Sequence, residues 1–129
     1  MAQGILIDTD ILVDYLRGYS QAKTFLESLE SRPSTSVICV AELFAGIRDE
    51  KEQAAIERFL LPFELLPVDD QIARLGGQFR KSYRHSHGTG LADAIIAATA
   101  YIHGYTLATF NDRHYPMVSN WLMPYSKSA

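Results

Sequence analysis

The stretch GILIDTDILVDYLRG, Gly4–Gly18, decides the fold because its pattern changes at Asp8. A short apolar run that ends in an acid, as here, is typical of a buried parallel strand. After Asp8, apolar residues recur at helical spacing as far as Gly18, a typical helix stop. The stretch also carries three carboxylates, Asp8, Asp10 and Asp14. Acids beside a buried strand are costly unless they are used, so Asp8 is a candidate nucleophile or metal ligand in phosphate chemistry.

Strands and helices alternate along the rest of the chain. The apolar spacing predicts helices over 22–29, 49–61, 69–83 and 91–103, with Asp69 as a helix cap. Strands are predicted at 36–40 (SVICV, or a strand entering a helix at 41–47), 63–68, 105–110 and, at an edge, 120–125. This alternation predicts an α/β fold with a mainly parallel central sheet flanked by helices, formed by residues 1–129 as a single domain.

Composition limits the classes of protein to consider. The chain has 129 residues, of which 47% are hydrophobic, and this is enough for one core. No apolar run reaches the roughly 18 residues of a membrane span, and no signal peptide is expected, since charge appears already at Asp8. The single cysteine, Cys39, fits a reducing cytosol, so we expect a cytoplasmic protein without membrane association. The net charge of -3 argues against a module that binds nucleic acid by bulk attraction.

Acidic residues recur where a parallel sheet would place a ligand. Asp8 ends the first strand, Asp112 follows the strand at 105–110, and we place Glu42 and Asp93 in the first turns of helices, among apolar neighbours. Each has a structural alternative. Asp93 could favour a helix N-terminus, Glu42 could belong to a capping box, and Asp112 beside Asn111 could be turn chemistry.

Four acids at one sheet edge point to a bound cation. Clustered carboxylates repel one another, and all-oxygen sites suit hard ions such as Mg²⁺ or Mn²⁺. Zinc would call for histidine or cysteine ligands, and the four histidines show no zinc-type pairing with Cys39. Asp10 is close enough to assist, whereas Asp14 is expected on the outer side of its helix.

Four motifs together resemble the PIN-domain family, and within it the VapC-type ribonuclease toxins of toxin–antitoxin pairs. They are ILIDTDILVDYL, SVICVAELFAG, LADAIIAATA and LATFNDRHYP, in this order and spacing. The resemblance covers nearly the whole chain. It implies a PIN-like three-layer sandwich and an endoribonuclease that hydrolyses RNA phosphodiesters with water activated by Mg²⁺, or by Mn²⁺ as a substitute.

The resemblance also implies a ligand set. The family's motif acids correspond to Asp8, Glu42 and Asp93, of which Asp8 and Asp93 would be metal ligands and Glu42 a third ligand or an outer acid. Many relatives place an acid three positions after an asparagine, but here Asn111 is followed at that spacing by His114. Asp112 is therefore a candidate fourth catalytic acid. Asp10, Asn111 and Thr109 are candidate auxiliary residues. Thr109 and Thr9 could orient water or phosphate, although a core or strand-packing role is the simpler interpretation of each.

The resemblance further implies three partners: an RNA substrate, a small antitoxin and a second copy of the chain in a homodimer. Basic residues that could contact RNA phosphates are Arg80, Lys81, Arg84 and Arg113, although a solvated helix face is the simpler interpretation of each. Apolar residues that could line an antitoxin groove, or simply belong to the core, are Leu12, Tyr15, Leu16, Phe25 and Phe59.

Three other functions remain open on the sequence alone. A haloacid-dehalogenase-like phosphatase would use Asp8 as nucleophile and Asp10 as acid/base, but no clear phosphate-clamping lysine follows. A receiver-like signalling domain would want a lysine after a late strand, and YTLATFND, residues 105–112, offers none. A non-catalytic PIN-like binding module is disfavoured because Asp8, Glu42 and Asp93 are all kept.

Overall fold

A computed structural model describes residues 4–126 and contains a five-stranded sheet in the order β3-β2-β1-β4-β5. Every neighbouring pair of strands is parallel. The strands are β1 (Ile5–Ile7), β2 (Ser34–Ser36), β3 (Glu64–Leu66), β4 (Thr106–Ala108) and β5 (Trp121–Leu122). The predicted α/β class is confirmed, and so is the edge position of the last strand.

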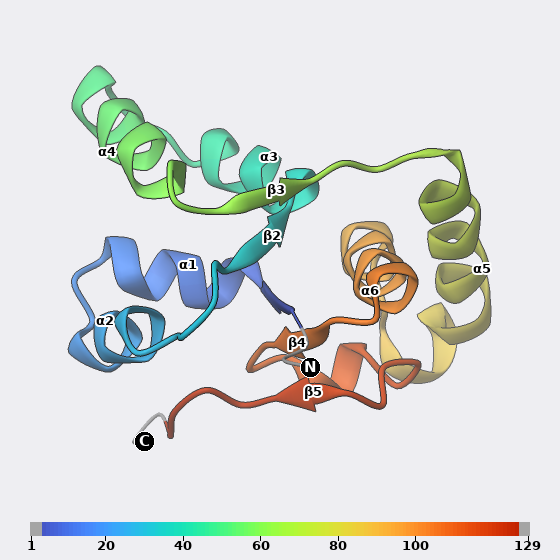
Figure 1. The fold of residues 1–129 in the computed structure, drawn as a ribbon. Helices are drawn as coiled ribbons and strands as arrows, with labels where there is room; N and C mark the ends of the chain where they lie inside the picture. The colour runs from blue at the N-terminus through green and yellow to red at the C-terminus, as the bar shows by residue number, and fades with distance from the viewer. Residues whose placement is uncertain (1–3, 127–129) are drawn as a thin grey trace.

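Helices cover both faces of this sheet, as a three-layer sandwich requires. They are α1 (Thr9–Leu16), α2 (Ser20–Glu27), α3 (Val37–Ala45), α4 (Glu50–Leu60), α5 (Asp70–His87) and α6 (Leu91–His103), followed by the 3₁₀ helix η1 (Asp112–His114). In Figure 1, α1 and α2 lie on one side of the strands, and α5 and α6 on the other. Among the described residues, no helix is both long and apolar enough to cross a membrane.

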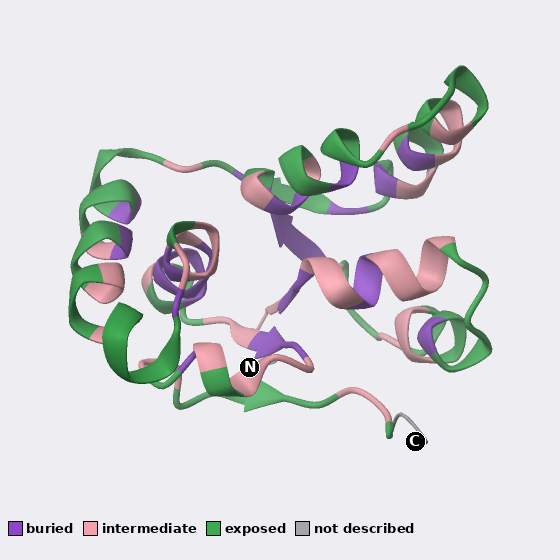
Figure 2. Ribbon diagram, turned by 180° about the vertical axis from the view of Figure 1, so that it is seen from behind, coloured by how far each residue is buried: buried purple, intermediate pink, exposed green. Residues whose placement is uncertain are grey.

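The core includes residues of the central strands, of the small-residue helix α6, and of α1, α3 and α4. Leu6 and Ile7 of β1 are fully buried, as are Ala97 and Ala98 of α6. Figure 2 shows buried residues concentrated on the central strands and α6, whereas the edge strand β5 and the outer side of α5 are exposed. Helix α5 packs closely on α6 because Gly76 has no side chain there, and a Cβ at that position would lie 2.9 Å from Ile95 Cγ1.

One predicted strand boundary was wrong. The apolar SVICV stretch predicted a strand at 36–40, but the strand ends at Ser36 and α3 begins at Val37. The Ser36 side chain caps this helix by accepting a hydrogen bond from the Ile38 amide (3.0 Å). The polar strand β2 is nevertheless buried, because its hydroxyls find acceptors; Thr35 donates to the Ile7 carbonyl (2.8 Å).

Helix α5 is longer than its pattern predicts. Asp69 caps it as expected, accepting from the Ile72 amide (2.9 Å). The apolar spacing predicted a helix over 69–83, yet α5 continues to His87 and ends at Gly88, which adopts the left-handed conformation with φ of 66°. The basic end of this long helix therefore lies directly before the loop that leads to α6.

Candidate active site

The candidate site lies where the strand order of the sheet reverses. From β1 the chain builds outward to β2 and β3, then crosses to β4 on the other side of β1. In open parallel sheets this reversal leaves a crevice beyond the carboxyl ends of the two strands. Asp8 follows β1 and Thr109 follows β4, so both residues lie at the carboxyl end of the sheet, where its strand order reverses.

Asp8 is held there as a buried carboxylate. It is 5% exposed and caps α1, with Oδ1 accepting from the Thr9 amide (2.8 Å). Its Oδ2 accepts from the hydroxyls of Thr109 (2.8 Å) and Tyr115 (3.0 Å). Within residues 4–126, no lysine, arginine or histidine forms an ion pair with Asp8. Its negative charge is thus met by neutral donors alone.

Burial perturbs the ionisation of this acid. Desolvation, followed by repulsion from Asp10, raises the pKa of Asp8 from 3.8 to about 7. The hydrogen bonds from Thr109, Thr9 and Tyr115 oppose this rise without cancelling it. A cation bound beside Asp8 would relieve the same repulsion, since opposite charge favours the ionised form.

Asp93 approaches the site from the first turn of α6, as predicted. Its Oδ1 accepts from the Tyr115 hydroxyl (3.2 Å), and its Oδ2 lies 3.2 Å from His114 Nδ1. The same His114 nitrogen lies 2.9 Å from Asn111 Nδ2. The structure thus brings Asp8, Asp93 and Asn111 into one network with two residues of the segment after β4.

Tyr115 is the site residue that the sequence patterns did not indicate. Its side chain is 1% exposed, and its hydroxyl lies within hydrogen-bond distance of both Asp8 and Asp93. It is separated from Asp8 by 107 positions, so no local periodicity connects the two. The available signal was a polar-tipped aromatic side chain within the motif LATFNDRHYP, residues 107–116.

Glu42 lies beside the network. It does not stand in the first turn of its helix, where it was predicted. Because α3 begins at Val37, Glu42 stands in the second turn, where it is exposed. Its Oε1 accepts from the Thr9 hydroxyl (2.7 Å), and not from a capping-box amide. Thr9 thereby links Glu42 to Asp8, whose carboxylate accepts from the Thr9 amide.

Two of the other predicted acids are tied to nearby structure. Asp10 accepts from the amides of Ile11 (2.8 Å) and Phe110 (2.9 Å), which fastens the start of α1 to the segment after β4. Asp14 was predicted to be a surface residue, but it is half-buried and accepts from the Tyr125 hydroxyl (2.8 Å).

Asp112 is not part of the observed network. It opens η1, and within the part of the chain that is described its carboxylate makes no hydrogen bond or ion pair. The structure therefore brings Asn111, and not Asp112, into contact with His114, whose Nδ1 lies beside Asp93.

The predicted RNA-contacting residues differ in how far they are exposed to solvent. Arg80 is half-buried, and its Nε donates to the Thr89 carbonyl (3.3 Å) in the loop between α5 and α6. Lys81, Arg84 and Arg113 are exposed. The loop itself borders the site, because a Cβ on Gly90 would lie 4.0 Å from Asp93 Oδ2.

The donor atoms fit a hard cation bound by few protein ligands. Among residues 4–126, no three His, Cys, Asp or Glu side chains are arranged to hold one metal ion. Mg²⁺ commonly uses only one or two carboxylates and fills its other positions with water and substrate phosphate. Asp8 and Asp93 offer such a pair, and the uncompensated burial of Asp8 is the feature that a cation would relieve.

Comparison with known proteins agrees with this geometry. The PIN-domain family model matches residues 5–118. Ribonuclease VapC19 of Mycobacterium tuberculosis is 41% identical over 93% of this chain and 98% of its own length, and Ribonuclease VapC10 of the same organism is 38% identical over 95% and 93%. A toxin–antitoxin complex from Klebsiella pneumoniae superposes with a TM-score of 0.83 at 27% identity, covering 96% of this chain and 100% of its own. PIN-domain ribonucleases of the VapC type generally depend on a divalent metal ion. The chain belongs to the PIN-domain family.

Proposed function

We propose that this protein is a Mg²⁺-dependent endoribonuclease, the toxin of a type II toxin–antitoxin pair. The observation that carries the proposal is the buried Asp8 carboxylate at the strand-order reversal, joined to Asp93 and lacking a cationic partner among the described residues. The ribonuclease names of the similar mycobacterial proteins support the same activity.

Asp8 and Asp93 are the proposed metal ligands, with Glu42 as third ligand or outer acid. Their oxygens favour Mg²⁺, with Mn²⁺ as a substitute, over softer ions. Cys39 does not compete as a ligand, because burial raises the pKa of its thiol to about 12. When bound, the divalent ion would polarise the scissile phosphate and lower the pKa of a water molecule.

The surrounding side chains have supporting parts in this proposal. Thr109 orients Asp8 through its hydroxyl, and Thr9 orients Glu42. Asn111 and His114 contact each other beside Asp93, so Asn111 is the stronger candidate than Asp112 for an auxiliary role at the site. Asp112 remains a proposed fourth catalytic acid, although its carboxylate makes no hydrogen bond or ion pair among the described residues.

RNA would approach across the rim formed by Lys81, Arg84 and Arg113. The rim is open to solvent, and the first two residues lie on the basic end of α5, directly before the loop that borders Asp93. Phosphate contacts from such residues position a nucleic acid without reading its sequence. Arg80 has a smaller part here because it already bonds to Thr89.

The phosphatase alternative is weakened by the same contacts. Asp10, the required acid/base of that alternative, accepts hydrogen bonds from two backbone amides instead.

RNA cleavage by purified protein tests the proposal. Wild type, Asp8→Asn and the matched control Asp14→Asn are incubated with total RNA and Mg²⁺ or EDTA, and the new RNA ends are sequenced. We expect discrete ends with wild type and Asp14→Asn in Mg²⁺, and none with Asp8→Asn or EDTA. Cleavage by Asp8→Asn would refute the assignment, and a wild type that binds RNA without cutting it would favour a binding module.

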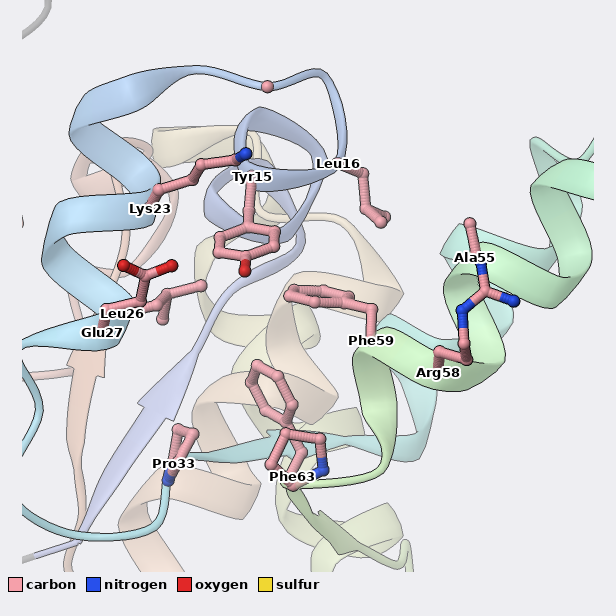
Figure 3. Close-up of a pocket in the computed structure, with 12 residues that line it drawn as sticks. Tyr15, Leu16, Lys23, Leu26, Glu27, Pro33, Ala55, Arg58, Phe59 and Phe63 are labelled. Atoms are coloured by element: carbon pink, nitrogen blue, oxygen red, sulfur yellow. The ribbon is translucent and has the colours of Figure 1, made fainter.

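An apolar cleft between α1, α2 and α4 is the proposed antitoxin site. Its volume is about 580 Å³, and the rings of Tyr15 and Phe59 stack across it with centroids 4.7 Å apart (Figure 3). Leu16 also lines it. Leu12 instead lies in the core, and Phe25 packs against the core without lining this cleft, so the core alternative holds for these two residues.

The charges at this cleft allow a direct test. Lys23 and Arg58 outnumber Glu27 among its lining residues, which favours a partner with apolar and acidic side chains. We expect Arg58→Glu to weaken copurification with the product of a short adjacent reading frame, whereas Lys51→Glu, an exposed change on the same helix, leaves it intact. Equal retention by both variants would rule out the cleft.

Three further predictions complete the proposal: a homodimer, a cytoplasmic location and one domain over residues 1–129. One continuous sheet and one core support the single domain. Light scattering of the purified protein tests the dimer, and fractionation of cells that express it tests the location.

A further inference from the structure

We propose that Tyr115 is a positioning residue that holds Asp8 and Asp93 at the spacing at which one divalent cation binds both. The inference rests on the proposed function, because it presupposes that these two acids form the metal site. It assigns a role to a tyrosine side chain, which is not one of the acidic residues of the motifs.

The Tyr115 hydroxyl is the described contact that the two acids share. It lies 3.0 Å from Asp8 Oδ2 and 3.2 Å from Asp93 Oδ1. Thr109 reaches Asp8, and His114 reaches Asp93, but each contacts one acid of the pair. Because Asp8 ends a strand and Asp93 belongs to a helix, their relative position depends on a group that bridges these elements.

The ring of Tyr115 is fixed well enough to serve this purpose. It is 1% exposed and belongs to the main apolar cluster, where close packing allows little movement. The backbone beside it is held as well, since the Tyr115 amide donates to the Asp112 carbonyl (2.9 Å) and the Thr89 hydroxyl donates to the His114 carbonyl (2.8 Å). The hydroxyl is thus presented to both acids from a rigid support.

Removing the hydroxyl should therefore loosen the acid pair without emptying the core. Phenylalanine keeps the ring, whereas the two carboxylates lose their shared hydrogen-bond partner and repel each other more freely. Loss of such an orienting partner behind metal ligands typically lowers metal affinity by about 10- to 100-fold. We expect a loss of that size for Tyr115→Phe.

Calorimetric titration with Mn²⁺ of the metal-free protein tests this without relying on cleavage. The matched control is Tyr125→Phe, which removes another tyrosine–aspartate hydrogen bond, from Tyr125 to Asp14 (2.8 Å), outside the acid pair. We expect the Mn²⁺ dissociation constant to rise about 10- to 100-fold in Tyr115→Phe and to stay within about twofold in Tyr125→Phe. Replacing Tyr115 by 4-aminophenylalanine, which restores a donor, should recover most of the affinity.

The outcomes separate this inference from the function on which it rests. A wild type that binds no Mn²⁺ would refute the proposed metal site itself. Unchanged affinity in Tyr115→Phe, with wild-type binding intact, would overturn only the positioning role. Equal weakening by phenylalanine and 4-aminophenylalanine would also overturn it, because the donor would then not matter. Circular dichroism checks whether each variant is folded. If Tyr115→Phe does not fold, the 4-aminophenylalanine variant decides: wild-type Mn²⁺ affinity supports the positioning role, and a 10-fold loss of affinity overturns it.

Discussion

The buried Asp8 carboxylate makes the stability of the metal-free protein depend on pH in a predictable direction. Its pKa is raised from 3.8 to about 7 in the folded state. The folded protein therefore binds this proton more tightly than the unfolded chain, and the stabilisation is fully present below pH 3.8 and lost as pH rises through 7. A shift of about three pKa units corresponds to about 4 kcal/mol in the free energy of unfolding.

Asp8→Asn isolates this effect, because asparagine has nearly the same shape and does not ionise. The free energy of unfolding is measured by urea denaturation in EDTA, at intervals from pH 4 to pH 8.5, for wild type and variant. Other titrating groups contribute equally to both proteins, so the difference between the two curves reports Asp8. We expect the wild type to lose about 4 kcal/mol relative to Asp8→Asn over this range.

Two results would refute this reasoning. A difference that stays constant with pH would mean that Asp8 is solvated as in the unfolded chain. If the free energy of unfolding of the wild type rose with pH relative to that of the variant, the Asp8 carboxylate would be stabilised in its ionised form, as by a cationic partner. Mg²⁺ at about 100 times its dissociation constant should restore about 2.7 kcal/mol to the wild type at pH 8, and nothing to Asp8→Asn.

Three other changes test separate parts of the molecule. Thr109→Val removes a hydroxyl that lowers the pKa of Asp8, so we expect cleavage to fall about 10-fold at pH 7 and its pH profile to move upward; an unmoved profile contradicts this. Arg84→Ala in cleavage-dead Asp8→Asn protein should reduce the salt slope of RNA binding by about 0.7, measured by filter binding in graded KCl, whereas an unchanged slope would exclude a phosphate contact. Gly76→Ala should lower the free energy of unfolding in urea by about 1–3 kcal/mol, because the added Cβ meets Ile95. Gly77→Ala, whose Cβ meets nothing within 4 Å, should raise it by about 0.5–1 kcal/mol. Equal effects would rule out close packing at Gly76.

The sequence predicted the fold well where pattern and packing agree. The strand before Asp8, the alanine-rich helix α6 and the edge strand β5 all lie where expected. The boundary at Ser36 was wrong because Val and Ile favour strands in general, whereas a capping serine and the buried polar strand β2 decide this position.

The site was predicted only where its residues belong to local motifs. Asp8 and Asp93 belong to recognisable motifs, and the structure places both against one hydroxyl. Tyr115 could not be predicted, because its importance arises from contacts with residues 107 and 22 positions away. Likewise, the exposure of Glu42 follows from where α3 begins, which depends on the cap at Ser36.

The central place of β1 in the sheet has a consequence for biosynthesis. Of the five described strands, β1 is synthesised first, but one of its two neighbours, β4, begins only at Thr106. Tyr115, which touches both acids, is made later still. A nascent chain that stops before these residues carries Asp8 without its hydrogen bonds from Thr109 and Tyr115. Under the proposed function, the order of synthesis thus delays assembly of the acid pair in a growing copy until Tyr115 has been made.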